Sequence, residues 1–191
     1  WLIQTEVYYN YINNFIYLKP SLPATLTIRG AFPTFRYEQV NAAFTGIDFK
    51  VAYRIFKSLS WKGKASFLRA YNITTQEGIV GMPANRFENA LEYKLDKLKF
   101  LSDVYTEVGF LNVMEQNNVP LNSDYLSPPD SYGLLNFKAG LSIPTYNQQE
   151  IMVDFKISNL LNTAYRDYLN RFRYYADEMG RNYSLKLKMT F

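Results

Sequence analysis

The sequence contains no cysteine and no histidine. These absences exclude disulfides, thiolate metal sites and cysteine nucleophiles, and they remove the commonest general base and metal ligand. No apolar run approaches the roughly 18 residues of a transmembrane helix. The net charge of +4 is spread along the chain and forms no basic cluster. We therefore expect no metal site, no cofactor and no nucleic-acid partner.

Aromatic residues are abundant instead. Tyrosine, phenylalanine and tryptophan make up 17% of a chain that is 48% apolar and 20% charged. A soluble core could hold that many rings, and so could the lipid face and interfacial girdles of a membrane barrel. Composition alone leaves both classes of protein open.

Apolar and polar residues alternate along most of the chain, which predicts antiparallel β-strands with one apolar and one polar face. In the last strand Leu185 and Leu187 alternate with Lys186 and Lys188. Helical periodicity is hard to find. We predict about eight strands, at 2–18, 34–56, 60–73, 86–95, 98–113, 132–143, 149–163 and 181–191.

The predicted connections alternate in length. Short ones fall at 57–59, 96–97 and 145–148, and long ones at 19–33, 74–85, 114–131 and 164–180. A membrane barrel has short periplasmic turns and long external loops, whereas soluble sandwiches follow no such rule. Strand 34–56 exceeds the ~9–11 residues that cross a bilayer, so we expect it to extend beyond the membrane. The pattern favours an all-β, antiparallel, up-and-down transmembrane β-barrel.

The C-terminal region carries a recognisable motif. Residues 154–168 read DFKISNLLNTAYRDY, and Gly180-Arg181-Asn182 opens the final alternating strand. This tail resembles the end of TonB-dependent outer-membrane receptors, where an NLxNxxYRDY pattern precedes a last strand beginning with GRN. Segments 41–48 and 82–86 resemble earlier strands of the same family. The sequence of residues 165–182 is similar to that of receptors from Bacteroidetes-type bacteria.

The resemblance implies that residues 1–191 are the C-terminal segment of a larger, 22-stranded barrel, without its plug domain and earlier strands. It implies a transporter of the bacterial outer membrane, energised through TonB, and not an enzyme. The implied partners are outer-membrane lipids, TonB, a small-molecule substrate and the barrel-assembly machinery. That machinery is expected to recognise the apolar row of the last strand: Tyr183, Leu185, Leu187, Met189 and Phe191.

Loop 164–180 is rich in arginine and tyrosine. We expect Arg171, Arg173 and Tyr174 to face a substrate vestibule, where charge-assisted hydrogen bonds and stacking would hold an anionic, partly aromatic ligand such as a ferric siderophore. The alternative for these arginines is a solvated or internally paired loop.

Two other functions are considered for the whole chain. One is an autonomous eight-stranded outer-membrane barrel with an adhesin, structural or small-pore role. The other is a soluble β-sheet binding module, for example a carbohydrate-binding sandwich.

Overall fold

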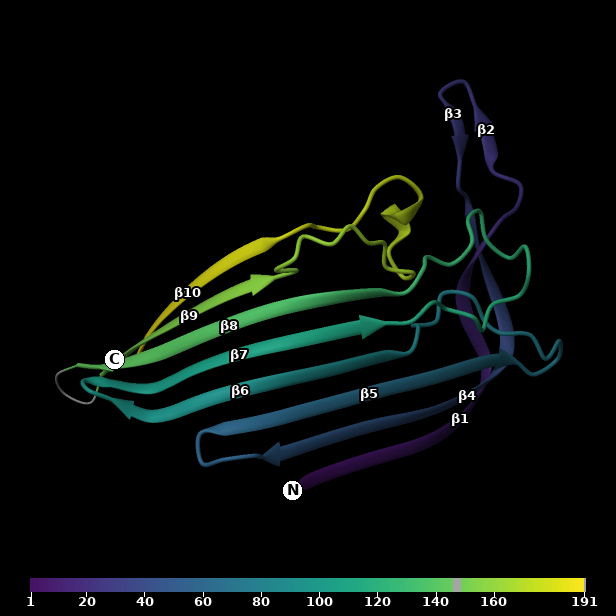
Figure 1. Ribbon diagram of the computed structural model, residues 1–191. Coiled ribbons are helices and arrows are strands. Elements are labelled where there is room, and N and C mark those ends of the chain that lie inside the picture. Colours follow the sequence, from purple (N-terminus) through teal and green to yellow (C-terminus); the bar gives the residue numbers. More distant parts are fainter. Residues whose placement is uncertain (146–148, 191) are drawn as a thin grey trace.

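The chain forms one open, antiparallel sheet of eight strands in the computed structural model, which describes residues 1–145 and 149–190 (Figure 1). Each strand pairs with its neighbours in chain order, and the outer edges of the first and last strands are free in the described part of the chain. This confirms the predicted all-β, up-and-down architecture. The strands are β1 (Leu2–Pro20), β4 (Phe35–Arg54), β5 (Leu59–Asn72), β6 (Arg86–Leu98), β7 (Leu101–Val113), β8 (Tyr132–Pro144), β9 (Glu150–Ser158) and β10 (Asn182–Thr190).

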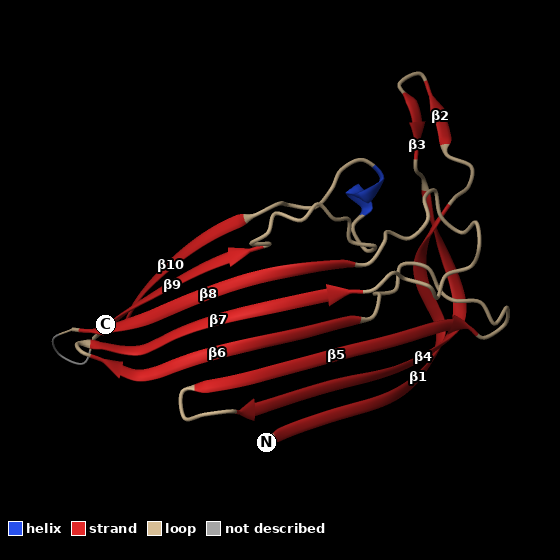
Figure 2. Cartoon of the chain, in the orientation of Figure 1, coloured by secondary structure: helices blue, strands red, loops and turns tan. Residues whose placement is uncertain are grey.

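Long and short connections lie at opposite ends of the sheet, as predicted (Figures 1 and 2). The start of β1 and the end of β10 lie at the end with the short turns. One predicted turn was misplaced. The ladder continues past 96–97 to the pair Leu98 and Leu101, and the chain turns at Lys99, whose φ is 56°. Part of another predicted turn, residues 146–148, lies outside the described residues.

Two long loops differ from the prediction. Loop 19–33 contains a short hairpin, β2 (Thr25–Thr27) and β3 (Gly30–Phe32), which projects beyond the sheet (Figure 1). The strand predicted over 149–163 ends at Ser158, because Asn159 turns the backbone to a φ of 52°. The Asn159 side chain then bonds the backbone N–H and C=O of Thr163, both at 2.8 Å.

One face of the sheet is apolar. The register places Leu187 opposite Val153, and Val153 opposite Leu141, so their side chains share a face. Many of these side chains point away from the protein; Leu187, for example, is 68% exposed. An exposed apolar surface of this extent is unfavourable in water and is normally covered. In a membrane barrel lipid covers it.

The other face is charged and internally paired. Glu92, Glu107, Lys138 and Lys156 lie opposite one another on successive strands. Lys138 Nζ lies 2.7 Å from Glu107, and Lys62 Nζ lies 2.6 Å from Glu92. Lys62 also reaches Glu107 at 3.5 Å, so it neutralises two carboxylates that face each other. This polar face is the kind that lines the interior of an outer-membrane barrel.

The buried core lies at the loop end and not between two layers. Residues 73–85 fold over β4 and β5, so that Ile79 is fully buried beside Ala42 and Ala70. No helix in the described part of the chain is long and apolar enough to cross a membrane. The connections after β5, β7 and β9 contact one another at this end of the sheet.

Candidate substrate-binding hollow at the loop end

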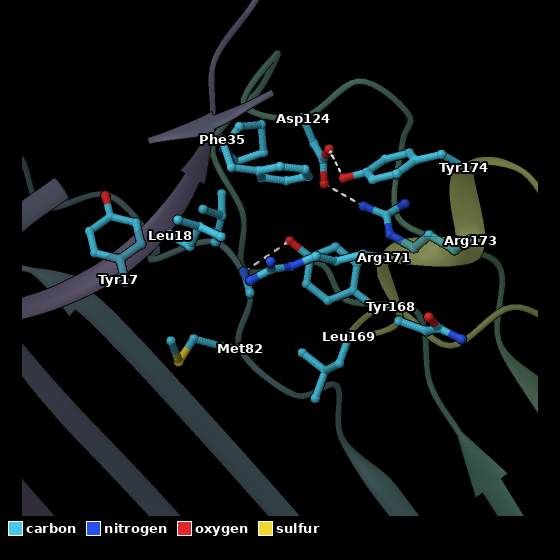
Figure 3. Close-up of a pocket in the computed structure, with 14 residues that line it drawn as sticks. Tyr17, Leu18, Phe35, Met82, Asp124, Tyr168, Leu169, Arg171, Arg173 and Tyr174 are labelled. Carbon is cyan, nitrogen blue, oxygen red and sulfur yellow. Dashed lines mark hydrogen bonds and ion pairs between the residues drawn. The ribbon is translucent and has the colours of Figure 1, made fainter. Parts of the chain in front are cut away.

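A hollow of about 210 Å³ lies where the long connections meet (Figure 3). Its walls come from the end of β1, the start of β4 and three loops, so residues far apart in the sequence face one space. Its lining is mostly aromatic and apolar, with three charged side chains. The lining residues are Tyr17, Leu18, Pro20, Phe35, Val80, Gly81, Met82, Asp124, Tyr168, Leu169, Asn170, Arg171, Arg173 and Tyr174.

A buried ion pair holds two of the loops together. Arg173, which is only 3% exposed, forms a salt bridge with Asp124 from the preceding long loop. The Tyr174 hydroxyl donates a 2.6 Å hydrogen bond to the other oxygen of Asp124. The Arg173 guanidinium also lies over the rings of Tyr168 and Tyr174, at 4.9 and 4.7 Å from their centroids. Both oxygens of Asp124 are thus engaged, and Arg173 balances its charge.

The environment keeps the tyrosines of this cluster protonated. Burial, reinforced by the hydrogen bond to Asp124, raises the pKa of Tyr174 well above its ordinary value. Burial also raises the pKa of Tyr168. The backbone N–H of Gly81 donates to the Tyr168 hydroxyl at 3.4 Å and lowers this pKa, but by less than burial raises it. Near neutral pH both hydroxyls remain neutral, and Tyr174 remains a donor to Asp124.

Arg171 is placed differently from Arg173. It begins the single turn of 3-10 helix η2 (Arg171–Tyr174), and the Asn170 side chain caps this turn by accepting from the N–H of Phe172 at 2.9 Å. The Arg171 guanidinium lies over the Phe35 ring, 5.2 Å from its centroid. Among the described residues no carboxylate lies within salt-bridge distance of Arg171. It is an exposed cation held in place by an aromatic ring.

The structure brings the three predicted substrate-binding residues together at this hollow. Arg171, Arg173 and Tyr174 all line it (Figure 3). Arg173 also has the internal pairing considered as the alternative, and Arg166 pairs likewise with Asp177 at 2.7 Å. Contact of the three residues with a substrate stays a prediction.

The sequence singled out three of the lining residues and missed others, among them Asp124 and Phe35. Asp124 gave no local indication, because its partners lie 49 and 50 residues further along the chain. Phe35 was counted only as the beginning of a strand.

The motif of the C-terminal tail has a structural explanation. The Asn162 side chain accepts a hydrogen bond from the N–H of Arg181 at 2.8 Å, which joins the two ends of the last loop. Gly180 is needed for space here, since a Cβ at this position would lie 2.6 Å from the Asn162 side-chain oxygen. The NLxN and GRN segments therefore belong to one loop closure.

The last strand carries the residues that the barrel-assembly machinery is expected to recognise. Tyr183, Leu185, Leu187 and Met189 are exposed along one face of β10, and Phe191 lies outside the described residues. Their recognition by the assembly machinery stays a prediction.

A two-faced, open sheet of long strands with a loop-end hollow defines a section of an outer-membrane β-barrel, a fold of the bacterial outer membrane. No family model matches the chain, and no curated protein matches it. Among solved structures it is similar to the copper transporter OprC, with a TM-score of 0.76 at 14% identity. The match covers 97% of this chain but 28% of that protein, so the chain spans about a quarter of its neighbour's length.

Proposed function

We propose that this chain is the C-terminal wall segment, residues 1–191, of a TonB-dependent outer-membrane receptor that imports a scarce nutrient. The observation that carries the proposal is the match of nearly the whole open sheet to part of a transporter barrel. The motif tail supports it, because Asn162 and Arg181 close one loop in the structure. The similarity of the tail to Bacteroidetes-type receptors makes such a bacterium the proposed source.

In this proposal the chain binds and transports but catalyses no reaction. Substrate enters from outside through the long loops, while TonB acts on the plug domain of the receptor. The apolar face contacts outer-membrane lipid, and the β10 row from Tyr183 to Phe191 presents the assembly sequence. The polar face, with paired side chains such as Lys138 and Glu107, lines the interior.

We propose an anionic, partly aromatic complex such as a ferric siderophore as the substrate. Arg171 supplies the cation, Phe35 and Tyr174 supply rings, and Arg173 fixes the loop that carries them. The structural neighbour transports copper. Within residues 1–145 and 149–190, however, acidic, histidine and cysteine side chains form no group of three or more that could hold a bare metal ion. The donor set of this hollow therefore suits an organic anion better than a free cation.

Uptake by the intact receptor tests both parts of the proposal. Cells that depend on this receptor are given a ferric siderophore as their only iron source, and uptake is measured with a labelled complex. The triple variant Arg171→Ala, Arg173→Ala, Tyr174→Ala is expected to lose uptake. Because Arg173 is buried, Arg171→Ala alone is the decisive variant, since it removes an exposed side chain. The matched control is Arg29→Ala with Tyr37→Ala, which are exposed and outside the hollow.

Each outcome has a distinct meaning. Unchanged uptake in both hollow variants contradicts the substrate contact. Deletion of the receptor without any loss of siderophore or copper uptake contradicts the import role. A detergent-free, soluble and monomeric protein would favour the β-sheet binding module instead, because two bare sheet edges and an apolar face promote aggregation in water.

A further inference from the structure

Two adjacent residues of loop 114–131 reach in opposite directions. Asp124 holds Arg173 and Tyr174 of the last loop, as described above. The Tyr125 hydroxyl lies 2.7 Å from the carbonyl oxygens of Ser21 and Thr34, to either of which it can donate. It also accepts a hydrogen bond from the N–H of Thr34 at 2.9 Å. One dipeptide thus contacts two segments that are far apart in the sequence.

Tyr125 contacts the hairpin at its root. The β1–β4 ladder ends at the pair Pro20 and Phe35, followed by one more backbone bond from Ser21 N–H to Thr34 C=O at 2.8 Å. Beyond this point β2 and β3 pair only with each other. Apolar side chains of this hairpin are exposed: 82% for Leu26 of β2 and 105% for Ile28 of the turn that follows it. The direction of the hairpin therefore depends on its root, where Tyr125 binds.

Phe35 connects this root to the hollow. It directly follows Thr34, and its ring lies 6.1 Å from the Tyr125 ring and 6.3 Å from the Tyr174 ring, centroid to centroid. The Arg171 guanidinium rests on the same ring. A shift of Thr34 moves Phe35, and a shift of Phe35 removes the surface that holds Arg171. The Tyr125 hydroxyl is therefore linked to Arg171 by its hydrogen bond to Thr34, the peptide bond from Thr34 to Phe35, and the contact of Phe35 with Arg171.

We infer that Asp124 and Tyr125 are positioning residues that join the β2–β3 hairpin and the last loop into one body and thereby set the place of Arg171 at the hollow. As a statement about substrate affinity, this inference rests on the proposed function. As a statement about how the two segments are joined, it stands on the geometry alone. Neither residue needs to touch the substrate.

The joining is tested by a distance measurement in the intact receptor. The described chain has no native cysteine to remove. Spin labels at Ile28→Cys and Phe172→Cys, both on exposed positions, report the distance between the hairpin and the last loop. Tyr125→Phe removes only the hydroxyl, and Asp124→Asn removes the charge that holds Arg173. Tyr37→Phe is the matched control, because it makes the same chemical change on an exposed residue of β4.

We expect one narrow distance distribution in the parent and in Tyr37→Phe, and a broad one in Tyr125→Phe and Asp124→Asn. A distribution as narrow in Tyr125→Phe as in the parent overturns the inference. This measurement needs no substrate.

A second arm separates positioning from mere stability. With a ferric catecholate complex as the probe, Tyr125→Phe is expected to raise the half-saturating concentration for uptake about three- to tenfold, the loss of one hydrogen bond. The maximal rate should remain that of the parent, because folded receptor is still present. A lower maximal rate with unchanged half-saturation overturns the positioning role. If the parent itself does not import the complex, the proposed function fails, and the spin-label distances still decide the joining.

Discussion

The Arg173–Asp124 salt bridge gives the sharpest prediction, because the structure offers a comparison. A second arginine–aspartate salt bridge, Arg166–Asp177, lies in the same loop but is exposed. The side chains of Arg173 and Asp124 are 3% and 12% exposed, whereas those of Arg166 and Asp177 are 39% and 51% exposed. Both pairs hold the same loop. Removing one partner of a buried pair leaves an uncompensated charge and costs about 3–5 kcal/mol. An exposed pair contributes about 0–1 kcal/mol.

The perturbation is Arg173→Met, compared with Arg166→Met. Methionine retains much of the aliphatic packing against the tyrosine rings, and it removes the charge. Asp124 then keeps the hydrogen bond from Tyr174, so the lower end of the range is expected. Since each 1.4 kcal/mol is tenfold in an equilibrium constant, about 3 kcal/mol corresponds to a roughly 150-fold increase in loop opening. Arg166→Met removes the exposed pair and also a 2.8 Å hydrogen bond from Arg166 to the Arg173 carbonyl, so it should increase opening by about 30-fold at most.

Amide hydrogen exchange of the detergent-solubilised receptor measures this opening. The reporters are the N–H groups of Tyr175 and Ala176, which donate to the carbonyl of Phe172 at 2.8 and 2.9 Å within the loop. Their exchange should accelerate more in Arg173→Met than in Arg166→Met, while strand amides keep parental rates. Equal acceleration in the two variants would refute the argument that burial makes the Arg173–Asp124 salt bridge the stronger stabiliser of the loop.

Three further outcomes are expected. Gly46→Val should reduce the heat-modifiable folded band on gels, because a Cβ at Gly46 would overlap the Tyr8 ring, and Tyr8→Ala should restore the band. The raised pKa of Tyr174 stabilises the loop fully below the ordinary tyrosine value of 10.0, and this contribution is lost as pH rises above it. Limited proteolysis of the loop should therefore increase above about pH 10, and Tyr174→Phe should flatten that dependence. Asn162→Ala should accelerate exchange of the Arg181 amide about fivefold, the loss of roughly 1 kcal/mol.

The strands could be predicted from the sequence because the alternation of apolar and polar residues within each strand shows that its two faces differ. Period-2 alternation in β10, with Leu185 and Leu187 against Lys186 and Lys188, needs no knowledge of the rest of the chain. The ends of strands were less certain. β9 stops where Asn159 takes a positive φ, which its apolar neighbours Leu160 and Leu161 do not reveal.

The missed features are of two kinds, very short strands and contacts between distant segments. The three-residue strands β2 and β3 are too short to show alternation. Asp124 and Tyr125 acquire their roles only from residues on other loops, up to 104 positions away. Loop 164–180 could be chosen as a binding loop from its arginines and tyrosines. Which arginine is paired and which is exposed follows from tertiary packing, and the sequence leaves both possibilities open.

The central claim is that the apolar face of the sheet contacts lipid. It is tested most directly by fluorescence quenching in the intact receptor reconstituted into bilayers. Single labels at Leu187→Cys and Val153→Cys are compared with labels at Lys186→Cys and Lys156→Cys, which lie on the other face of the same two strands. A quencher attached to lipid chains should quench the first two labels and leave the second two bright. Equal quenching of all four labels, or quenching of the lysine positions alone, would contradict the account of this chain as the wall of a membrane barrel.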